Sequence, residues 1–420
     1  MKKKIIIIIL LIATFKTEAQ TSVLKVADSL LSIGNYQSAL VKLKSIKSPS
    51  LKVLTKTAGI YQGVGDYTNA IVFYKQAYNL SPSDKIKEKI GRSYQASGNS
   101  SKAIELYEEV LKAKPENRLL KYELAKLYSN HLKVNKAIDL FSELSKKDTL
   151  NPNYQYQLGV AYHKLGQKGF YDSGNHFLKT YKIDSLHLKS IYNLVKFYKK
   201  LKFKDSTSLF IDKGLKINPK SVSFNQLKVK DVFLKKEFDT TLVYLKTLEE
   251  LNSKTMFTYK MYGLTYLKLK DYEKAKSYFR IAQTIDFKDV NVLYNLGLVN
   301  KALKNYKEAE MNFLMSINFQ RPDVDANYYE LGTLQLEQKQ LKKALESFTK
   351  GYENNRKNYL ILFQLAMLTD DYYKDKKIAL KHYKKYISSF STRHAASTLY
   401  AKQRIKEIKK ELFIKGERVD

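Results

Sequence analysis

The residue types that most often carry out chemistry are present, but their spacing matches no known kind of site. Gly59, Gly63 and Gly65 are spaced like a phosphate-binding loop, yet no Lys-Ser/Thr pair follows Gly65 and no strand precedes Gly59. The pair Asp370-Asp371 is interpreted as turn residues rather than as an acid/base pair. The chain contains no Gly-x-Ser-x-Gly motif, and its histidines are scattered without the His-Glu-x-x-His spacing of a zinc site: His131, His163, His176, His187, His382 and His394.

Cysteine is absent from the 420 residues. Its absence excludes thiol catalysis, zinc-thiolate sites and disulfide bonds. Together with the scattered histidines, it predicts a protein that is not an enzyme and that uses no metal and no cofactor.

A repeated pattern of two amphipathic helices and a tight turn accounts for most of the chain. In residues 258–286, Gly263 and Ala275 stand where two antiparallel helices would face each other, and Tyr266 and Phe279 fill the space beside them. Replacing either small residue with Leu is expected to overpack the pair, at a cost of about 1–3 kcal/mol.

Three columns of residues repeat at close to the 34-residue period of helix–turn–helix arrays, which predicts eleven units. The first column is small or branched: Ala27, Ala58, Gly91, Ala125, Gly159, Val195, Val229, Gly263, Gly297, Gly332 and Ala366. The second is alanine: Ala39, Ala70, Ala103, Ala137, Ala275, Ala309 and Ala344. The third is bulky: Leu43, Tyr74, Tyr107, Phe141, Ile211, Leu245, Phe279, Phe313 and Phe348. Prolines are expected to end three second helices: Pro82, Pro115 and Pro219.

These columns resemble the tetratricopeptide repeat over about nine-tenths of the chain. The fullest match runs from Ala58 to Pro82, with these residues in register: Tyr61, Gly65, Tyr67, Ala70, Tyr74 and Ala77. The resemblance implies an all-α fold, a right-handed superhelical solenoid of antiparallel helix pairs. The chain departs from the family pattern because it contains no Trp and has Val195 and Val229 where Gly or Ala is usual. The helix pairs at those two positions are expected to sit further apart.

Both ends of the chain differ from the repeats. Residues 1–19 begin with Lys2, Lys3 and Lys4, continue with an apolar run over residues 5–13 and end at Ala19, which predicts a secretory signal peptide cleaved after Ala19. The apolar run is about half the roughly 20 residues that a membrane anchor requires. The solenoid is expected over residues 20–392. A basic capping helix and tail should follow over residues 393–420, with an apolar stripe of Leu399, Ile405, Ile408 and Leu412.

Residues 167–175 make one unit longer than its neighbours. Gly169 and Gly174 favour a protruding loop that exposes the aromatic side chains of Phe170 and Tyr171. An insertion of this kind is also tolerated without any function, because loops accept extra length at little cost.

The family resemblance implies that the first helices of successive units line a concave surface. Aromatic and lysine side chains in that surface would suit an extended peptide or an acidic tail. The family's carboxylate clamp is not reproduced, since Leu264 follows Lys260 at the required spacing. The candidate partner-binding residues are Tyr122, Lys126, Tyr156, Tyr192, Lys196, Lys230, Lys260, Tyr294, Tyr329 and Phe363.

The formal net charge of +34 favours acidic partners. Most of the basic residues are Lys rather than Arg, which favours background composition over a dedicated polyanion site. The preferred hypothesis is a non-enzymatic scaffold for protein partners in a bacterial periplasm, or secreted, without a membrane span in its mature form and without nucleic acid as its ligand. The alternative is a protein that binds an acidic glycan, lipid headgroups or nucleic acid through its Lys-rich surface.

Overall fold

The computed structural model describes residues 20–131, 133–319, 324–415 and 417. These residues contain helices and turns but no strand, as the predicted all-α fold requires. The predicted signal peptide, residues 1–19, lies outside the described residues. No helix among the described residues has both the length and the apolar character needed to cross a membrane.

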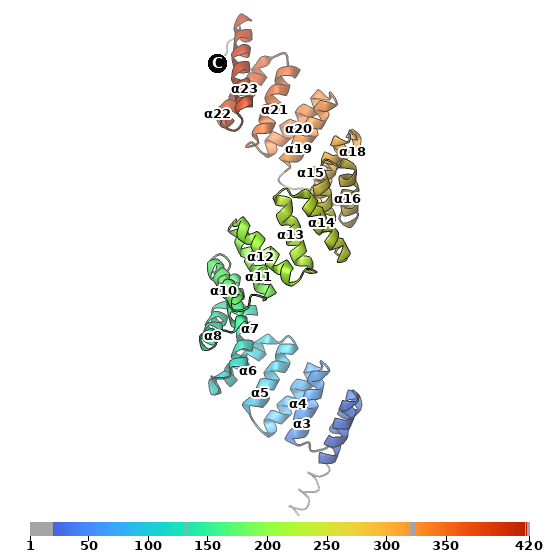
Figure 1. The fold of residues 1–420 in the computed structure, drawn as a ribbon, viewed down its shortest axis with the longest axis vertical. Coiled ribbons are helices and arrows are strands. Elements are labelled where there is room, and N and C mark those ends of the chain that lie inside the picture. The colour runs from blue at the N-terminus through green and yellow to red at the C-terminus, as the bar shows by residue number, and fades with distance from the viewer. Residues whose placement is uncertain (1–19, 132, 320–323, 416, 418–420) are drawn as a thin grey trace, which may run out of the picture. The chain divides into compact units, whose positions relative to one another are not determined.

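The described helices form eleven antiparallel pairs in chain order, followed by one long helix (Figure 1). The first pair consists of a helix described over residues 20–32 and α2 (Tyr36–Lys44). The remaining first helices are α3 (Leu51–Gly63), α5 (Asp84–Ala96), α7 (Arg118–Asn130), α9 (Pro152–Lys164), α11 (Leu188–Lys200), α13 (Val222–Leu234), α15 (Met256–Lys268), α17 (Val290–Ala302), α19 (Asp325–Glu337) and α21 (Tyr359–Tyr372).

Their second helices are α4 (Tyr67–Leu80), α6 (Ser100–Ala113), α8 (Val134–Lys147), α10 (Phe170–Ile183), α12 (Lys204–Ile217), α14 (Phe238–Glu250), α16 (Tyr272–Ile285), α18 (Tyr306–Phe319), α20 (Leu341–Asn354) and α22 (Lys376–Phe390). The last helix is α23 (Ala395–Ile414). The chain divides into two compact units, residues 1–210 and residues 211–420.

Small residues allow the two helices of a pair to pack closely, as the sequence pattern predicts. A Cβ atom on Gly91 would lie 2.5 Å from Cε1 of Tyr107, and one on Gly297 would lie 2.4 Å from Cε1 of Phe313. Both rings are fully buried. At Val229 the opposing buried residue is Leu245 instead of an aromatic ring, so a branched side chain is matched by a smaller neighbour.

Most of the tight turns between first and second helices contain a residue with positive φ, and the type of this residue differs between the two units. In residues 1–210 glycine takes this conformation at Gly34, Gly65, Gly98 and Gly166, with Lys202 as an exception. In residues 211–420 lysine takes it in four turns, at Lys236, Lys270, Lys304 and Lys339. A side chain there costs backbone energy, so the second unit carries strain that the first largely avoids.

The expected protruding loop at residues 167–175 is wrong. The helix α10 already begins at Phe170, whose ring is half-buried with its centroid 4.9 Å from that of Phe197. Both glycines serve close packing rather than a loop. A Cβ on Gly169 would lie 2.0 Å from the carbonyl oxygen of Tyr162, and one on Gly174 would lie 2.3 Å from the Phe197 ring. Tyr171 is exposed, as expected.

Two expectations near the C-terminus also need correction. Leu399 is 70 % exposed and does not belong to the buried stripe of α23, which is formed by Thr398, Ala401, Ile408 and Leu412. Asp370 and Asp371 are not turn residues, because both lie in the last turn of α21.

The carboxylate of Asp370 is buried and accepts a hydrogen bond from Nε of Arg404 on α23 at 2.6 Å. Its Oδ1 atom also lies 3.4 Å from Nζ of Lys376. Burial by itself would raise the pKa of Asp370, but Arg404 and Lys376 lower it overall. The ion pair between Asp370 and Arg404 therefore links α23 to α21 of the final helix pair.

Candidate functional site

The predicted partner-binding residues all lie on first helices, and we call the surface that they form the first-helix face. Successive first helices contact each other, α7 with α9 in the first unit and α15 with α17 and α17 with α19 in the second. No two successive second helices among the described residues make a comparable contact. At these three places, the first helices therefore lie closer to one another than the neighbouring second helices do.

Tyr122 is the best-supported ring of the first-helix face in residues 1–210. Its centroid lies 5.8 Å from that of Phe141, which belongs to the bulky column of the same pair, and 5.9 Å from that of Tyr154 on α9. Nζ of Lys126 lies 5.4 Å from the Tyr122 centroid and 3.3 Å from Oε2 of Glu123. Tyr122 is thus held on both sides, and Lys126 is already paired.

Tyr156 and Tyr192 continue this face on α9 and α11. The ring centroid of Tyr156 lies 5.7 Å from that of Phe177 and 4.8 Å from that of His187, the N-cap of α11. Burial raises the pKa of the Tyr156 hydroxyl and lowers the pKa of His187, so both groups are neutral near pH 7. The exposed Lys196 places its Nζ 4.6 Å from the Tyr192 centroid.

In residues 211–420 the two predicted lysines differ from each other. Nζ of Lys260 lies 2.8 Å from Oδ2 of Asp289, the N-cap of α17, and both side chains are largely buried. Burial would raise the pKa of Asp289, but the ion pair with Lys260 and the hydrogen bond from the Val292 amide lower it overall. Lys230 is exposed, with its Nζ 5.0 Å from the Phe257 centroid. Lys260 therefore holds neighbouring repeats together, whereas Lys230 is accessible to a partner.

Tyr294 and Tyr329 repeat the arrangement of Tyr122. Each is half-buried, and each packs on the bulky residue of its own pair, with centroid distances of 5.9 Å to Phe313 and 6.1 Å to Phe348. Burial raises the pKa of Tyr294 to about 12. These rings present one face outward while the bulky column fixes the other.

Phe363 lies at the end of the array and is partly covered. Its centroid is 5.2 Å from that of Tyr386 on α22 and 6.0 Å from that of Tyr400 on α23. The last helix therefore limits access to this residue.

The structure distributes the predicted residues over two separate sets, one in each unit. Tyr122, Lys126, Tyr156, Tyr192 and Lys196 lie in residues 1–210, and the other five lie in residues 211–420. Sequence analysis missed the N-cap residues His187 and Asp289, which contact the face from the next first helix. The sequence does contain a signal for these two contacts. Each is a polar residue at the start of a first helix, about 30 residues after the residue of the first-helix face that it contacts.

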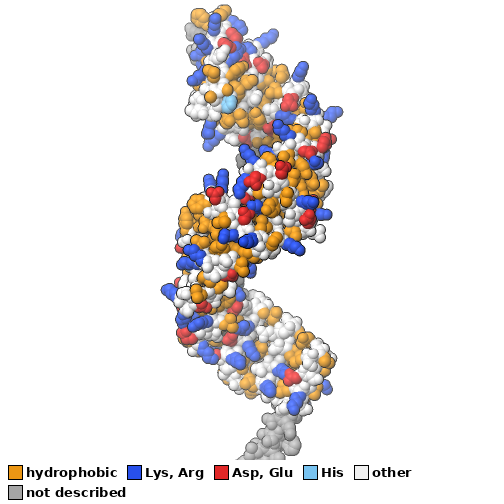
Figure 2. All heavy atoms as spheres, in the orientation of Figure 1, with side chains coloured by type: hydrophobic (Ala, Val, Ile, Leu, Met, Phe, Trp, Pro, Cys, Tyr) orange, Lys and Arg blue, Asp and Glu red, His pale blue; other side chains and the backbone are white. Residues whose placement is uncertain are grey.

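The described residues contain no group of three or more His, Asp or Glu side chains placed to hold a metal ion. Lys and Arg side chains are spread along the visible face of the molecule rather than gathered in one place (Figure 2). The first-helix face presents half-buried tyrosine rings and the exposed ammonium groups of Lys196 and Lys230.

Comparison with known proteins agrees with this repeat architecture. One family model described as Tetratricopeptide repeat matches residues 94–166, and a second with the same description matches residues 52–84 and 258–289. No curated protein matches the chain.

Several solved structures are similar. Yeast Tom70 is 13 % identical, with 95 % of this chain and 97 % of that chain covered and a TM-score of 0.41. Cut9–Hcn1, from the APC/C, is 13 % identical over 94 % and 98 %, with a TM-score of 0.42. The C-terminal part of a TPR repeat-containing protein from Cytophaga hutchinsonii is 15 % identical over 65 % and 98 %, with a TM-score of 0.43.

The family models fall on the same columns of small and bulky residues that pack within the helix pairs. Within the matched segments, the small column contributes Ala58, Ala125 and Gly263. The bulky column contributes Tyr74, Phe141 and Phe279, and all three of these rings are buried. From the matched segments and the eleven helix pairs, we conclude that the chain is a tetratricopeptide repeat protein.

Proposed function

We propose that this protein is an interaction scaffold that binds extended segments of partner proteins on its first-helix face. The observation that carries the proposal is the repeated support of half-buried rings from the second helix of the same pair. The bulky column supports Tyr122, Tyr294 and Tyr329, and Phe177 supports Tyr156. Rings fixed in advance lose little conformational freedom when a peptide binds, and they offer apolar contact area in a regular row.

Two exposed ammonium groups on other first helices would supply polar contacts for a partner. Lys196 and Lys230 both lie over aromatic rings and remain exposed. A partner segment with apolar and acidic residues would fit this combination.

Photochemical cross-linking tests this function. Tyr192 is replaced by p-benzoylphenylalanine, and Tyr171, which is 66 % exposed on the second helix α10, is replaced in the matched control. The Tyr192 variant should cross-link to defined partner proteins through extended segments, and adding Lys196→Glu should reduce the yield. Equal capture by the Tyr171 variant would contradict the proposal.

We also propose that the protein acts in the envelope of a bacterium, after export and removal of residues 1–19. The sequence of that segment supports the proposal. Cell fractionation with N-terminal sequencing tests it: the mature protein should start at Gln20 in the periplasmic or secreted fraction. Full-length protein in the cytoplasm would contradict export.

A cavity in residues 211–420 favours polyanion binding as a second candidate function. The cavity, of about 950 Å³, lies between α20, α21 and α22, and its described lining includes no acidic residue. Its cationic residues are Arg356, Lys357, Lys381, Lys384 and Lys385.

Inorganic polyphosphate is the probe for this cavity. Its affinity should fall steeply as salt is added, and the double variant Lys381→Glu, Lys385→Glu should weaken binding more than the control Lys342→Glu, Lys343→Glu, which has the same change in charge on exposed residues of α20. Equal effects of the two double variants would exclude a dedicated site.

A further inference from the structure

Two cavities in residues 1–210 lie between successive second helices and are built from corresponding residues. The first, the Lys75 groove, has a volume of about 450 Å³ and lies between α4 and α6 over α5. The second, the Glu108 groove, has a volume of about 530 Å³ and lies between α6 and α8 over α7. Both are separate from the first-helix face.

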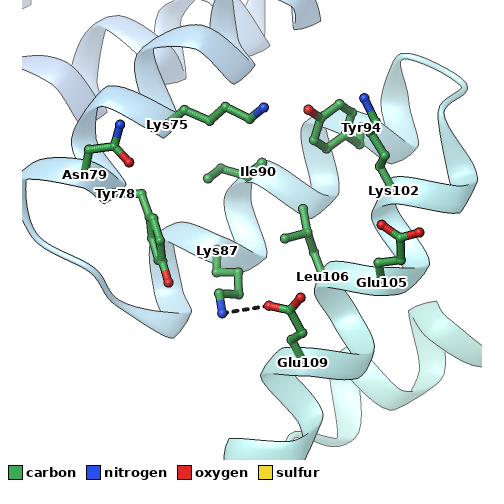
Figure 3. Close-up of a pocket in the computed structure, with 10 residues that line it drawn as sticks. All are labelled: Lys75, Tyr78, Asn79, Lys87, Ile90, Tyr94, Lys102, Glu105, Leu106 and Glu109. Carbon is green, nitrogen blue, oxygen red and sulfur yellow. Dashed lines mark hydrogen bonds and ion pairs between the residues drawn. The ribbon is translucent and has the colours of Figure 1, made fainter.

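The Lys75 groove combines two lysines, a tyrosine and an apolar floor. Figure 3 shows Lys75 reaching from α4 and Lys102 from α6 toward Tyr94 of α5, with Ile90 and Leu106 between them. Nζ of Lys75 and Nζ of Lys102 lie 5.6 Å and 5.4 Å from the Tyr94 centroid. Among the described residues, neither lysine forms an ion pair and the Tyr94 hydroxyl has no hydrogen-bond partner.

The Glu108 groove repeats this arrangement with one reversal of charge. Tyr128 and Lys136 occupy the places of Tyr94 and Lys102, and Nζ of Lys136 lies 5.4 Å from the Tyr128 centroid, the same distance as in the first groove. Glu108 is the ninth residue of α6, as Lys75 is the ninth of α4. A carboxylate thus stands in the second groove where an ammonium group stands in the first.

In the Glu108 groove, the carboxylate of Glu108 contacts both the tyrosine and the lysine. One oxygen, Oε1, accepts a hydrogen bond from the Tyr128 hydroxyl and lies 3.9 Å from Nζ of Lys136. Burial and the bond to Glu108 raise the pKa of Tyr128, so its hydroxyl stays protonated as a donor. The protein therefore shows within its own structure how a carboxylate binds between this tyrosine and this lysine.

We propose that the Lys75 groove binds the carboxylate of an acidic side chain from a partner protein. That carboxylate would accept a hydrogen bond from the Tyr94 hydroxyl and pair with Lys102, in the position that Glu108 takes in the next groove. Lys75 adds a second positive charge, and Ile90 and Leu106 contact the methylene groups of the incoming side chain.

The acidic residues already in the Lys75 groove do not fill this position. Glu109 pairs with Lys87, at 2.8 Å between Oε2 and Nζ. Glu105 is exposed and corresponds to Asp139, which lines the Glu108 groove alongside Glu108 itself. The second groove therefore accommodates a carboxylate in addition to this residue.

Peptide titration tests the site. The probe is a fluorescein-labelled dodecapeptide of alternating Glu and Ser, and its control has Gln in place of Glu. The substitution Lys75→Glu should recreate the Glu108 arrangement, with the new carboxylate occupying the site. Lys75→Glu should weaken the affinity for the peptide at least about tenfold. Lys102→Met should weaken it about fivefold, and Tyr94→Phe about threefold.

The matched control is Lys168→Glu, which makes the same change in charge at an exposed residue of the turn between α9 and α10. It should change the affinity by less than about twofold, because a distant exposed charge is screened by salt. Equal losses for Lys75→Glu and Lys168→Glu would overturn the proposal. So would equal binding of the Gln peptide, or displacement of the peptide by inorganic phosphate at concentrations where sodium chloride of the same ionic strength has no effect.

Discussion

The Lys75 groove and the Glu108 groove come from consecutive repeats, and their helices position nearly the same residues at the same places. Tyr94 matches Tyr128, and Lys102 matches Lys136. The grooves differ at the ninth residue of the second helix, where a positive side chain replaces a negative one. One groove is therefore complete by itself, and the other has a tyrosine and two lysines without a carboxylate.

This difference shows which positions of the repeat are free to vary. The small and bulky columns must be kept because they fill the interior of each helix pair. The ninth residue of a second helix lies at the rim of a groove, where a change of charge leaves the packing intact. The same backbone can therefore present a closed groove or an open one.

The largest effect is expected inside the α5–α6 pair, whose helices contribute to the Lys75 groove. Gly91→Leu should cost about 3 kcal/mol, because its side chain would meet the fully buried Tyr107 ring. Gly63→Leu is the control, since a Cβ there meets open space. It should stay within about 0.5 kcal/mol of the parent. Hydrogen exchange measures both, at the α5 and α6 amides for Gly91→Leu and at the α3 and α4 amides for Gly63→Leu. An equal loss of protection in the two variants would contradict the packing account.

The paired lysine that lines each groove provides the next contrast. Nζ of Lys121 lies 2.5 Å from Glu143 with its side chain 11 % exposed, whereas Lys87, paired with Glu109, is 21 % exposed. Glu143→Gln should cost about 1–2 kcal/mol, and Glu109→Gln less than about 1 kcal/mol, because the more buried cation loses more when it is left unpaired. Urea unfolding of the two variants measures the difference, and a larger cost for Glu109→Gln would reverse this order.

Reversing the charge at the ninth residue of α4 or α6 should change the stability of the surrounding helices by smaller amounts, with opposite signs in the two grooves. Lys75→Glu should stabilise α4–α6 by about 0.5 kcal/mol, because the new carboxylate can bind Tyr94 and Lys102. Glu108→Lys should destabilise α6–α8 by about 1 kcal/mol, since Tyr128 loses its acceptor. Hydrogen exchange of these helices is the measurement, and a loss of stability in both variants would show that the grooves are not equivalent.

Acid should remove the stabilisation that the ion pair between Lys121 and Glu143 provides at the Glu108 groove. The hydrogen bond from Lys121 lowers the pKa of Glu143 from its ordinary value of 4.5. Because the pKa is lower in the folded protein, the contribution is complete above pH 4.5 and is lost as the pH falls through the folded value. The difference in unfolding free energy between the parent and Glu143→Gln should therefore shrink below that pH. A constant difference down to pH 2 would contradict this assignment.

Much of the fold could be predicted because few residue types satisfy the packing between paired helices. Gly91 and Tyr107 recur in phase with their counterparts along the chain, and the structure buries them as expected. The prediction of a protruding loop was wrong because glycine occurs both in loops and where two helices pack closely. Gly169 and Gly174 resembled loop glycines, but they allow close contact with Tyr162 and Phe197.

Helical spacing alone could not fix the orientation of α23. Leu399 shares a helical face with other apolar residues, yet Thr398 and Ala401 are buried and Leu399 is exposed. The ion pair between Arg404 and Asp370 contributes to this orientation, and a contact between residues so far apart in the chain leaves no periodic signal.

The candidate site was predictable only as a row of residues. The family pattern located the face residues, but it could not show that Lys260 is paired with Asp289 while Lys196 is exposed. The two grooves were missed because their signal lies in a comparison of corresponding positions, Lys75 with Glu108, rather than in a motif.

The binding stoichiometry of the Glu108→Lys variant tests the relation between the two grooves most directly. Calorimetric titration with the Glu-Ser dodecapeptide should give one more site in this variant than in the parent protein, because Tyr128 and Lys136 would then lack their carboxylate as Tyr94 and Lys102 do. The same number of sites in both proteins, with the same affinity, would contradict the account.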